Sequence, residues 1–219
     1  TVFIMGKKEG VLREDDLELG QKFNNYYEIS KYEVEIIVNQ FRKKGLRINI
    51  FRPSVIMGSF ETGEIINFKL LYEAIRLCSK ELVPVLPAPQ NMSHNIIPVD
   101  LAAKAIFLLS ERGEVGNYHI VNPEDTSCLY FFEEAAKFFN YRNPQWLKPE
   151  NFDFKKLSPA VRYLIDPFVP YFDYKGKYSC EKTSKLLQEC NFYFPQLRQD
   201  YFVKIFQYCV DMNYIRKHK

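Results

Sequence analysis

Apolar and polar positions follow one another in blocks that predict strands and helices in turn. Residues 1–5 are β-branched or apolar and predict a strand, which a charged loop over 6–25 follows. Residues 27–45 place apolar side chains at helical spacing, and Lys43, Lys44 and Gly45 are typical of a helix C-terminus. An apolar strand is expected directly afterwards, at 48–51.

The alternation continues to about residue 140. Pro53, Gly58 and Gly63 interrupt regular structure, and Asp100 is a suitable N-cap for the helix that follows it. Another strand and turn are expected at 117–123. Further helices are expected at about 65–79, 101–113 and 127–140. Strands that alternate with helices in this way predict an α/β fold with a parallel sheet.

The pattern changes between residues 141 and 219, which are rich in aromatic residues and prolines and mostly helical in spacing. We therefore divide the chain at this point, into 1–140 and 141–219. Short helices that wrap around a pocket or against the sheet are expected in the second part. No repeat or low-complexity linker separates the two parts, so we expect them to share one core or a broad interface.

Composition narrows the classes of partner. The chain has 219 residues, 47% of them hydrophobic and 26% charged, with a net charge of +3. These values are typical of a globular protein and too weakly basic to indicate a nucleic-acid partner. No apolar run reaches the ~20 residues that a membrane span needs. We expect a small-molecule or carrier-bound partner instead, and the sequence says nothing of the oligomeric state.

Cysteines and histidines indicate no disulfide framework and no metal site. The five cysteines are odd in number and form no CxxC pair, which favours reduced thiols in a cytoplasmic protein. His94, His119 and His218 lie far apart in the sequence, without HxxxH or HExxH spacing. Each is most simply a core, loop or tail residue.

The most informative chemistry lies at Tyr27 and Lys31. Residues four apart on a helix lie on one face, so this phenol and this ammonium can address one ligand together. A nearby positive charge favours the phenolate, which suits a tyrosine to proton donation near neutral pH. The same spacing recurs at Tyr171 and Lys175 and again after Tyr178. On spacing alone, a buried helix tyrosine beside a solvated lysine is the preferred interpretation, so the context has to decide.

Four features in order provide that context: Thr1 before Gly6, the segment 25–31 (NYYEISK), the segment 52–58 (RPSVIMG), and PVD at 98–100 before a helix. Together they resemble the extended short-chain dehydrogenase/reductase family, in its thioester reductase and fatty acyl-CoA reductase (male-sterility) branch. Residues 6–35 and 117–123 are especially similar to that branch. The resemblance covers residues 1–140 well and the remainder loosely.

The resemblance implies a role for each matching residue. Tyr27 would donate the proton, and Lys31 would assist it while bonding the ribose of a nicotinamide cofactor. Thr1 would steady the substrate oxygen. Hydride addition to a carbonyl carbon leaves negative charge on oxygen, which requires a donor within hydrogen-bond reach. The cofactor-binding residues implied by the resemblance are Tyr27, Lys31, Pro53, Ser54, Val55 and Met57.

Structural roles remain open for several of these residues. Thr1 can be simply a strand residue, Pro53 and Gly58 can serve only to shape a loop, and Asp100 is more often a helix cap than a ligand contact. Ser30 is expected to pack within its own helix, and Tyr26 to be a neighbouring core or rim aromatic. The four features taken together favour a catalytic role over a purely structural one only for Tyr27 and Lys31.

One feature of the family is missing. The nine glycines form no GxGxxG or GxxGxxG, so the turn that holds a cofactor pyrophosphate is absent. We therefore expect a fragment that begins near the end of the nucleotide-binding half and binds NADP (or NAD) poorly. The choice between NADP and NAD depends on a residue of that missing half.

The resulting prediction is the C-terminal part of a Rossmann-like parallel sheet fold with a smaller, mostly helical substrate region. Residues 1–140 would belong to the reductase domain and its substrate loops, and residues 141–219 to the substrate region. The expected function is that of an oxidoreductase acting on an acyl thioester or related carbonyl. A sugar-nucleotide epimerase or dehydratase is the alternative enzyme, and a non-catalytic acyl-binding module is the alternative outside enzymes.

Overall fold

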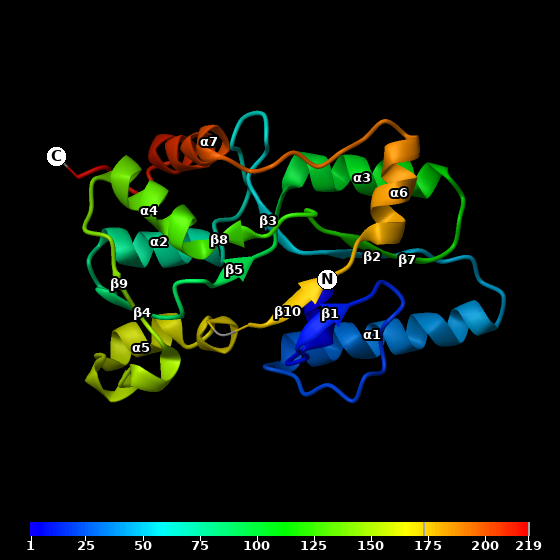
Figure 1. Cartoon of the computed structure of the whole chain (residues 1–219), viewed down its shortest axis with the longest axis horizontal. Helices are drawn as coiled ribbons and strands as arrows, with labels where there is room; N and C mark the ends of the chain where they lie inside the picture. The colour runs from blue at the N-terminus through cyan, green and yellow to red at the C-terminus, as the bar shows by residue number, and fades with distance from the viewer. Residues whose placement is uncertain (173, 219) are drawn as a thin grey trace. The chain divides into compact units, whose positions relative to one another are not determined.

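Two compact units make up the chain, and each draws on several separate stretches of the sequence. The computed structural model describes residues 1–172 and 174–218 (Figure 1). Unit 1 contains Thr1–Ile56, Asn95–Glu124 and Lys175–Gln196, and unit 2 contains Met57–His94, Asp125–Tyr174 and Leu197–Lys219.

Unit 1 combines short strand pairs with three α-helices and one 3₁₀ helix. Strand β2 pairs in parallel with β7, with Arg52 opposite His119, and β1 pairs in parallel with β10. Strand β3, which crosses the boundary between the units, pairs with β6. The elements are η1 (Val2–Met5), β1 (Gly10–Leu12), α1 (Tyr26–Lys43), β2 (Ile50–Pro53), β3 (Val55–Met57), β6 (Ile96–Pro98), α3 (Val99–Glu111), β7 (Asn117–Ile120), β10 (Gly176–Tyr178) and α6 (Glu181–Glu189).

Two apolar clusters hold unit 1 together. In the larger one, α3 and α6 pack on β7 through buried residues such as Ala105, Leu187 and Ile120. In the smaller one, Ile4 and Met5 of η1 pack with residues of the following loop and with partly buried residues of α1. Apolar burial of this kind stabilises a unit whose strands are too short to be stable as isolated pairs.

Unit 2 is built around helices α4 and α7, which pack against each other. Phe131 of α4 lies with its ring centroid 5.4 Å from that of Phe202 and 5.5 Å from that of Phe206, both on α7. The elements are α2 (Leu71–Ser79), β4 (Val85–Pro87), β5 (Ser93–His94), β8 (Thr126–Ser127), α4 (Cys128–Phe139), β9 (Gln145–Leu147), η2 (Pro149–Asn151), η3 (Phe154–Lys156), α5 (Pro159–Ile165), η4 (Val169–Tyr171) and α7 (Gln199–Asp211).

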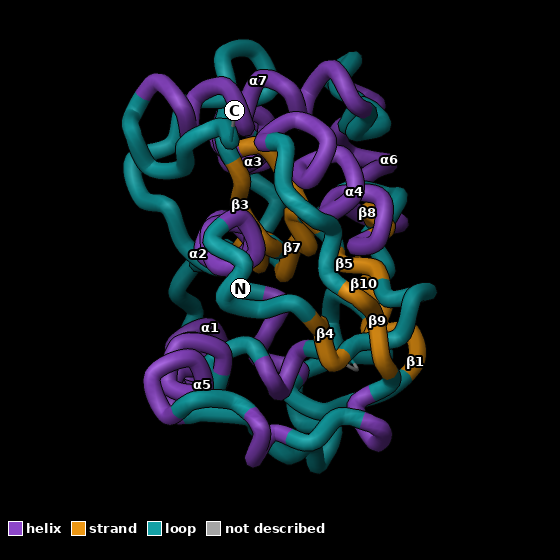
Figure 2. Tube along the Cα trace, turned by 90° about the vertical axis from the view of Figure 1, so that its left-hand side faces the viewer, coloured by secondary structure: helices purple, strands orange, loops and turns teal. Residues whose placement is uncertain are grey.

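The fold class predicted from the sequence is confirmed: helices alternate with strands, and the pairs β1–β10, β2–β7 and β4–β9 are parallel. Each described strand pairs with one neighbour, and the strands appear in Figure 2 as short segments divided by loops. The pair β5–β8 is antiparallel.

No helix among the described residues has the length and apolarity needed to cross a bilayer. All five cysteines carry free thiols.

The prediction of a strand at 1–5 is wrong, because Val2–Met5 form a 3₁₀ helix. Thr1 caps this helix through its side chain, and the Gly6 backbone N–H closes it with a 3.1 Å bond to the Phe3 carbonyl. Gly6 has φ of +55°, and a Cβ there would lie 2.2 Å from the Lys22 carbonyl oxygen, so the turn requires glycine. A short apolar run alone does not distinguish a strand from a helical turn.

Several predicted boundaries also differ from the structure. Strand β2 lies two residues later than expected, at Ile50–Pro53, and α2 begins only at Leu71. Asp100 is not the N-cap of α3, because Pro98 holds that position and Asp100 lies in the first turn. Proline has a fixed φ near −65°, which also suits the start of a helix. The helix predicted at 27–45, the helix at 127–140 and the strand at 117–123 match α1, α4 and β7.

Candidate active site

Helix α1 begins at a firmly capped turn. Its N-cap, Asn25, accepts a 3.0 Å hydrogen bond from the Glu28 backbone N–H. Glu28 is buried, and its carboxylate accepts bonds from the Asn24 backbone N–H at 2.7 Å and from the Asn24 side-chain amide at 3.0 Å. Such reciprocal capping satisfies backbone donors that a helix start leaves open. The turn that carries Tyr27 is therefore well defined.

Tyr27 and Lys31 lie together on the surface of α1. The Tyr27 side chain is exposed (52%), so the alternative of a buried helix tyrosine is wrong. The Lys31 Nζ lies 5.7 Å from the centroid of the Tyr27 ring, which is within the range of a cation–π contact. Tyr26 points into solvent at 88% exposure instead of joining a core, and Ser30 donates a 2.9 Å bond to the Tyr27 carbonyl of its own helix.

Thr1 lies at the start of a helical turn beside α1. It caps η1 through its side chain, and η1 packs against α1. The Thr1 Oγ1 accepts a 3.4 Å bond from the Phe3 backbone N–H. Accepting that bond leaves the hydroxyl proton able to donate to another group. The structure thus pairs Tyr27 with Lys31 on α1 and places Thr1 at the cap of the neighbouring η1.

The residues predicted to lie beside a nicotinamide ring occupy β2, β3 and the residue between them. Ser54 is buried, its backbone N–H donates to the Ile120 carbonyl at 3.2 Å, and its Oγ has no partner among the described residues. Val55 is buried beside it, and Pro53 is half-buried. Met57 is buried as well and is the first residue of unit 2. A buried hydroxyl without a partner is a position at which a ligand group can bond.

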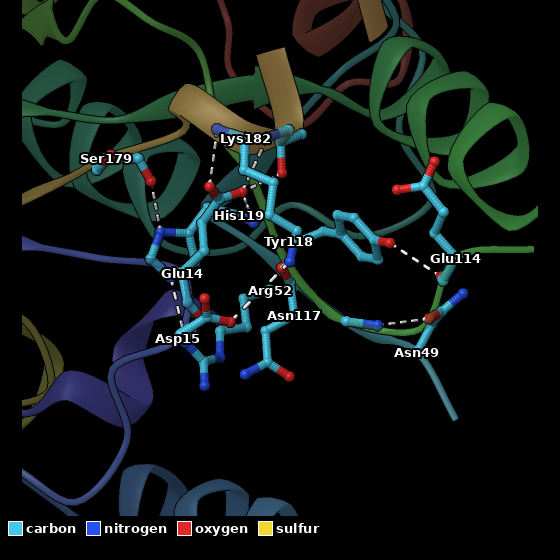
Figure 3. A network of polar contacts seen from close by, with 12 residues as sticks. Glu14, Asp15, Asn49, Arg52, Glu114, Asn117, Tyr118, His119, Ser179 and Lys182 are labelled. Atoms are coloured by element: carbon cyan, nitrogen blue, oxygen red, sulfur yellow. Dashed lines mark hydrogen bonds and ion pairs between the residues drawn. The ribbon is translucent and has the colours of Figure 1, made fainter. Parts of the chain in front are cut away.

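A buried arginine connects α1 to the strands of unit 1. Arg52 is fully buried, and its Nη2 lies 2.7 Å from an oxygen of Glu35, whose side chain is 7% exposed. The Arg52 Nε lies 3.1 Å from each oxygen of the same carboxylate. Its Nη1 donates to the Glu14 carbonyl at 2.9 Å and contacts the His119 Nε2 at 3.3 Å. Figure 3 shows Arg52, Glu14 and His119 converging in this network.

Glu14 binds the N-terminus of α6. Its carboxylate accepts bonds at 3.1 Å from each of the Lys182 and Thr183 backbone N–H groups, and a short bond from the Thr183 hydroxyl. It also accepts from the His119 backbone N–H at 3.3 Å. A carboxylate is favoured there by the open donors and the dipole of the helix. Residue 14 thereby fixes α6 next to β7, although α6 lies 168 residues further along the chain.

His119 is held in its neutral form. Its Nδ1 lies 2.8 Å from the Ser179 carbonyl, an oxygen that can only accept, so Nδ1 carries the proton and Nε2 accepts from Arg52. Burial, with the nearby Arg52 charge, lowers the pKa of His119 to about 4. The sequence suggested only a core, loop or tail histidine here, and the structure identifies a core histidine within a polar network.

Glu14 and Thr183 carry no local signal of their role, and Arg52 enters the sequence argument only as the first residue of the segment 52–58. Glu14 belongs to an acidic run that looks like a solvated loop, and Glu35 lies in a helix with many exposed charges. One signal was available: Glu35 follows Lys31 at the same four-residue spacing at which Lys31 follows Tyr27, so all three lie along one face of α1.

Unit 2 contains a separate cavity of about 250 Å³. The Asn143 Oδ1 is buried there without a partner among the described residues, and the lining includes the thiol of Cys78. Burial raises the pKa of Cys78 to about 12, so this thiol is not a nucleophile at neutral pH. No group of histidine, cysteine or acidic side chains within 1–172 and 174–218 could hold a metal ion.

Comparison with known proteins supports the resemblance noted in the sequence. A family described as "Male sterility protein" matches residues 1–106. A linear gramicidin synthase from Brevibacillus parabrevis is 25% identical over 226 residues, which cover 95% of this chain and 4% of that protein. The resemblance to the male-sterility branch of the extended short-chain dehydrogenase/reductases is therefore confirmed.

Solved structures share the fold. The terminal R domain of the myxalamid PKS-NRPS biosynthetic pathway has a TM-score of 0.81 at 21% identity, covering 100% of this chain and 58% of that one. UDP-glucuronic acid 4-epimerase from Bacillus cereus, in complex with NAD, has a TM-score of 0.64 at 17% identity, covering 97% of this chain and 60% of that one. The chain thus spans less than two thirds of each of these relatives.

The role of Glu14 can be tested by comparison with its neighbour. Glu14→Ala leaves buried N–H groups of α6 and β7 without acceptors, so we expect the free energy of unfolding to fall by about 2 kcal/mol or more. Asp15 is the matched control, because its side chain is 81% exposed and reaches Lys182 only at 4.0 Å. Asp15→Ala should change stability by less than about 0.5 kcal/mol in urea denaturation. Equal effects would contradict the proposed cap.

His119 makes stability depend on pH. The unfolded chain takes up the proton near the ordinary pKa of 6.5, whereas the folded chain resists it until about pH 4. The stabilisation is therefore complete above pH 6.5 and is lost as the pH falls towards 4, by up to about 3 kcal/mol. Burial lowers the pKa of His94 to about 4 as well, so His119→Gln should reduce the slope of the stability profile across this window by about half, measured by denaturation at several pH values. His218→Gln is the control, and an equal flattening there would contradict the assignment.

Proposed function

We propose that this chain, a relative of the male sterility protein family, is the C-terminal portion of a nicotinamide-dependent reductase that acts on an acyl thioester or a related carbonyl. The observation that carries the proposal is the pair on α1: an exposed phenol with an ammonium 5.7 Å from its ring. Thr1 caps η1, which packs against the same helix. The wider similarity to a terminal R domain supports the same class of reaction.

In this proposal the chain supplies the proton that the substrate oxygen takes up and a positive charge beside the donor. Tyr27 Oη donates its proton to the substrate oxygen as negative charge develops there, and the Lys31 ammonium lies beside the phenol ring. The Thr1 hydroxyl donates a second hydrogen bond to the same oxygen. We propose that a carbonyl that approaches Tyr27 also meets Lys31 of the same helix and the Thr1 hydroxyl, since η1 packs against α1.

The residues present fit a nicotinamide cofactor. Lys31 offers three N–H donors on an exposed side chain for the ribose hydroxyls, and the buried Ser54 Oγ is without a partner among the described residues. Pro53, Ser54 and Val55 would hold the nicotinamide end, and Met57 is proposed with them. The bound cofactor would supply the hydride. Because the chain has no glycine-rich pyrophosphate turn, we propose that it binds NADP or NAD weakly on its own.

The substrate in this proposal is an acyl group, presented either as a small molecule or on a carrier. We also propose that residues 1–140 form the reductase part and residues 141–219 the substrate-binding part. The chain is proposed to act in the cytoplasm, where its five free thiols would stay reduced.

An NAD-dependent sugar-nucleotide epimerase is the second candidate, supported by the fold shared with UDP-glucuronic acid 4-epimerase. The lower TM-score of that match, 0.64 against 0.81, favours the reductase.

A pair of adjacent tyrosines tests the assignment. In a longer polypeptide that joins this chain to an upstream nucleotide-binding segment, Tyr27→Phe removes the proton donor and should lower kcat at least about 100-fold. Tyr26→Phe removes the neighbouring exposed phenol and should leave turnover unchanged. Circular dichroism should find both variants folded, because both rings are exposed. Full turnover in the Tyr27 variant would refute its role as the donor.

A further inference from the structure

The ion pair of Glu35 and Arg52 lies next to the proposed catalytic face of α1. Tyr27, Lys31 and Glu35 follow one another at intervals of four residues and therefore share one side of the helix. The first two are exposed and the third is buried, so this side of α1 leaves the surface as it approaches Arg52. At this buried end the face of α1 contacts a strand of unit 1 through Arg52.

Arg52 is held from several directions at once. An arginine has five N–H donors in a rigid fork. Here the Nε and Nη2 face the Glu35 carboxylate, at distances of 3.1 and 2.7 Å. The Nη1 faces the Glu14 carbonyl at 2.9 Å and the His119 Nε2 at 3.3 Å. A guanidinium with partners on three sides cannot turn, so Glu35 is fixed relative to β2 and β7.

The strand that supplies Arg52 leads directly into the proposed cofactor residues. Pro53 and Ser54 follow Arg52 directly, and β2 is locked in register with β7, where Arg52 lies opposite His119. One ion pair therefore connects the helix face of Tyr27 and Lys31 to the segment that would meet the nicotinamide. We propose that Glu35 and Arg52 are positioning residues that fix this helix face relative to Pro53 and Ser54. The catalytic meaning of this inference rests on the proposed function.

The burial of the Glu35 and Arg52 ion pair indicates that the pair positions the face of α1 and does not serve only to stabilise the fold. Buried ion pairs are often replaceable by apolar side chains without loss of stability, because their desolvation offsets their attraction. What apolar residues cannot reproduce is the fixed, two-point geometry between a guanidinium and a carboxylate. A lysine at position 52 would keep the charge and lose that geometry.

Hydrogen exchange on this chain tests the positioning directly. Arg52→Lys should weaken the protection of the backbone amides of residues 30–35 at least tenfold, with the overall fold retained. Arg42→Lys is the matched control, because Arg42 lies near the other end of α1 and also makes several bonds, to Ile48, Asn117 and Gly116. It should leave residues 30–35 unchanged. Unchanged protection in a folded Arg52→Lys chain overturns the proposal.

A second variant covers the case in which Arg52→Lys does not fold. Glu35→Leu combined with Arg52→Met replaces the pair by apolar side chains and avoids an unpaired buried charge. It should fold and show the same tenfold loss of protection at residues 30–35. Full protection in this folded double variant would equally overturn the proposal, since the helix face would then be held without the ion pair.

Turnover separates this inference from the proposed function. In the longer polypeptide, Arg52→Lys should lower kcat at least tenfold and change KM by less than twofold, because it shifts the donor without removing a substrate contact. Arg42→Lys should change neither. Lost protection with unchanged kcat overturns the positioning role. Lost protection in a protein whose wild type does not reduce acyl thioesters means that the proposed function fails, while the role in fixing the helix face stands.

Discussion

Unit 1 depends on one buried charge, the guanidinium of Arg52. Fully removed from water, it is compensated by the Glu35 carboxylate, the Glu14 carbonyl and the His119 ring. Removing one partner of such a pair costs about 3–5 kcal/mol, because the other charge stays buried and unpaired. The folded state therefore requires the acidic loop, α1, β2 and β7 to contact one another at Arg52. These contacts fix the position of the exposed end of α1.

Further hydrogen bonds connect the partners of Arg52 to residues 179–183, which lie much later in the sequence. Glu14 accepts from Arg52 through its backbone and binds the N-terminus of α6 through its carboxylate. The neutral His119 contacts Arg52 through one ring nitrogen and the Ser179 carbonyl through the other. Residues 175–196 thus return to unit 1 through polar contacts as well as the apolar packing of α6 on α3. Buried networks specify one arrangement when their members are satisfied.

The sequence predicts local features well and the network poorly. Helix α1 and the pair Tyr27 and Lys31 follow from periodicity and from a four-residue spacing. By contrast, the bond between Glu14 and Thr183 joins residues 169 positions apart, and no local pattern in an acidic loop distinguishes a buried carboxylate from a solvated one. The strand expected at 1–5 is a 3₁₀ helix for a related reason: four apolar residues suit either form, and a turn at Gly6 decides. The return of residues 175–196 to unit 1 likewise depends on long-range contacts.

We propose that the tyrosine and lysine on α1 serve the reduction of an acyl thioester. Two assays of the longer polypeptide decide this: NADPH consumption with an acyl thioester, and chromatography of the products formed from a UDP-sugar. We expect NADPH oxidation and release of the free thiol with the thioester, and no conversion of the sugar nucleotide. Conversion of the UDP-sugar with the thioester left intact would instead identify an epimerase or dehydratase. Turnover of neither would contradict the catalytic assignment and favour a binding module.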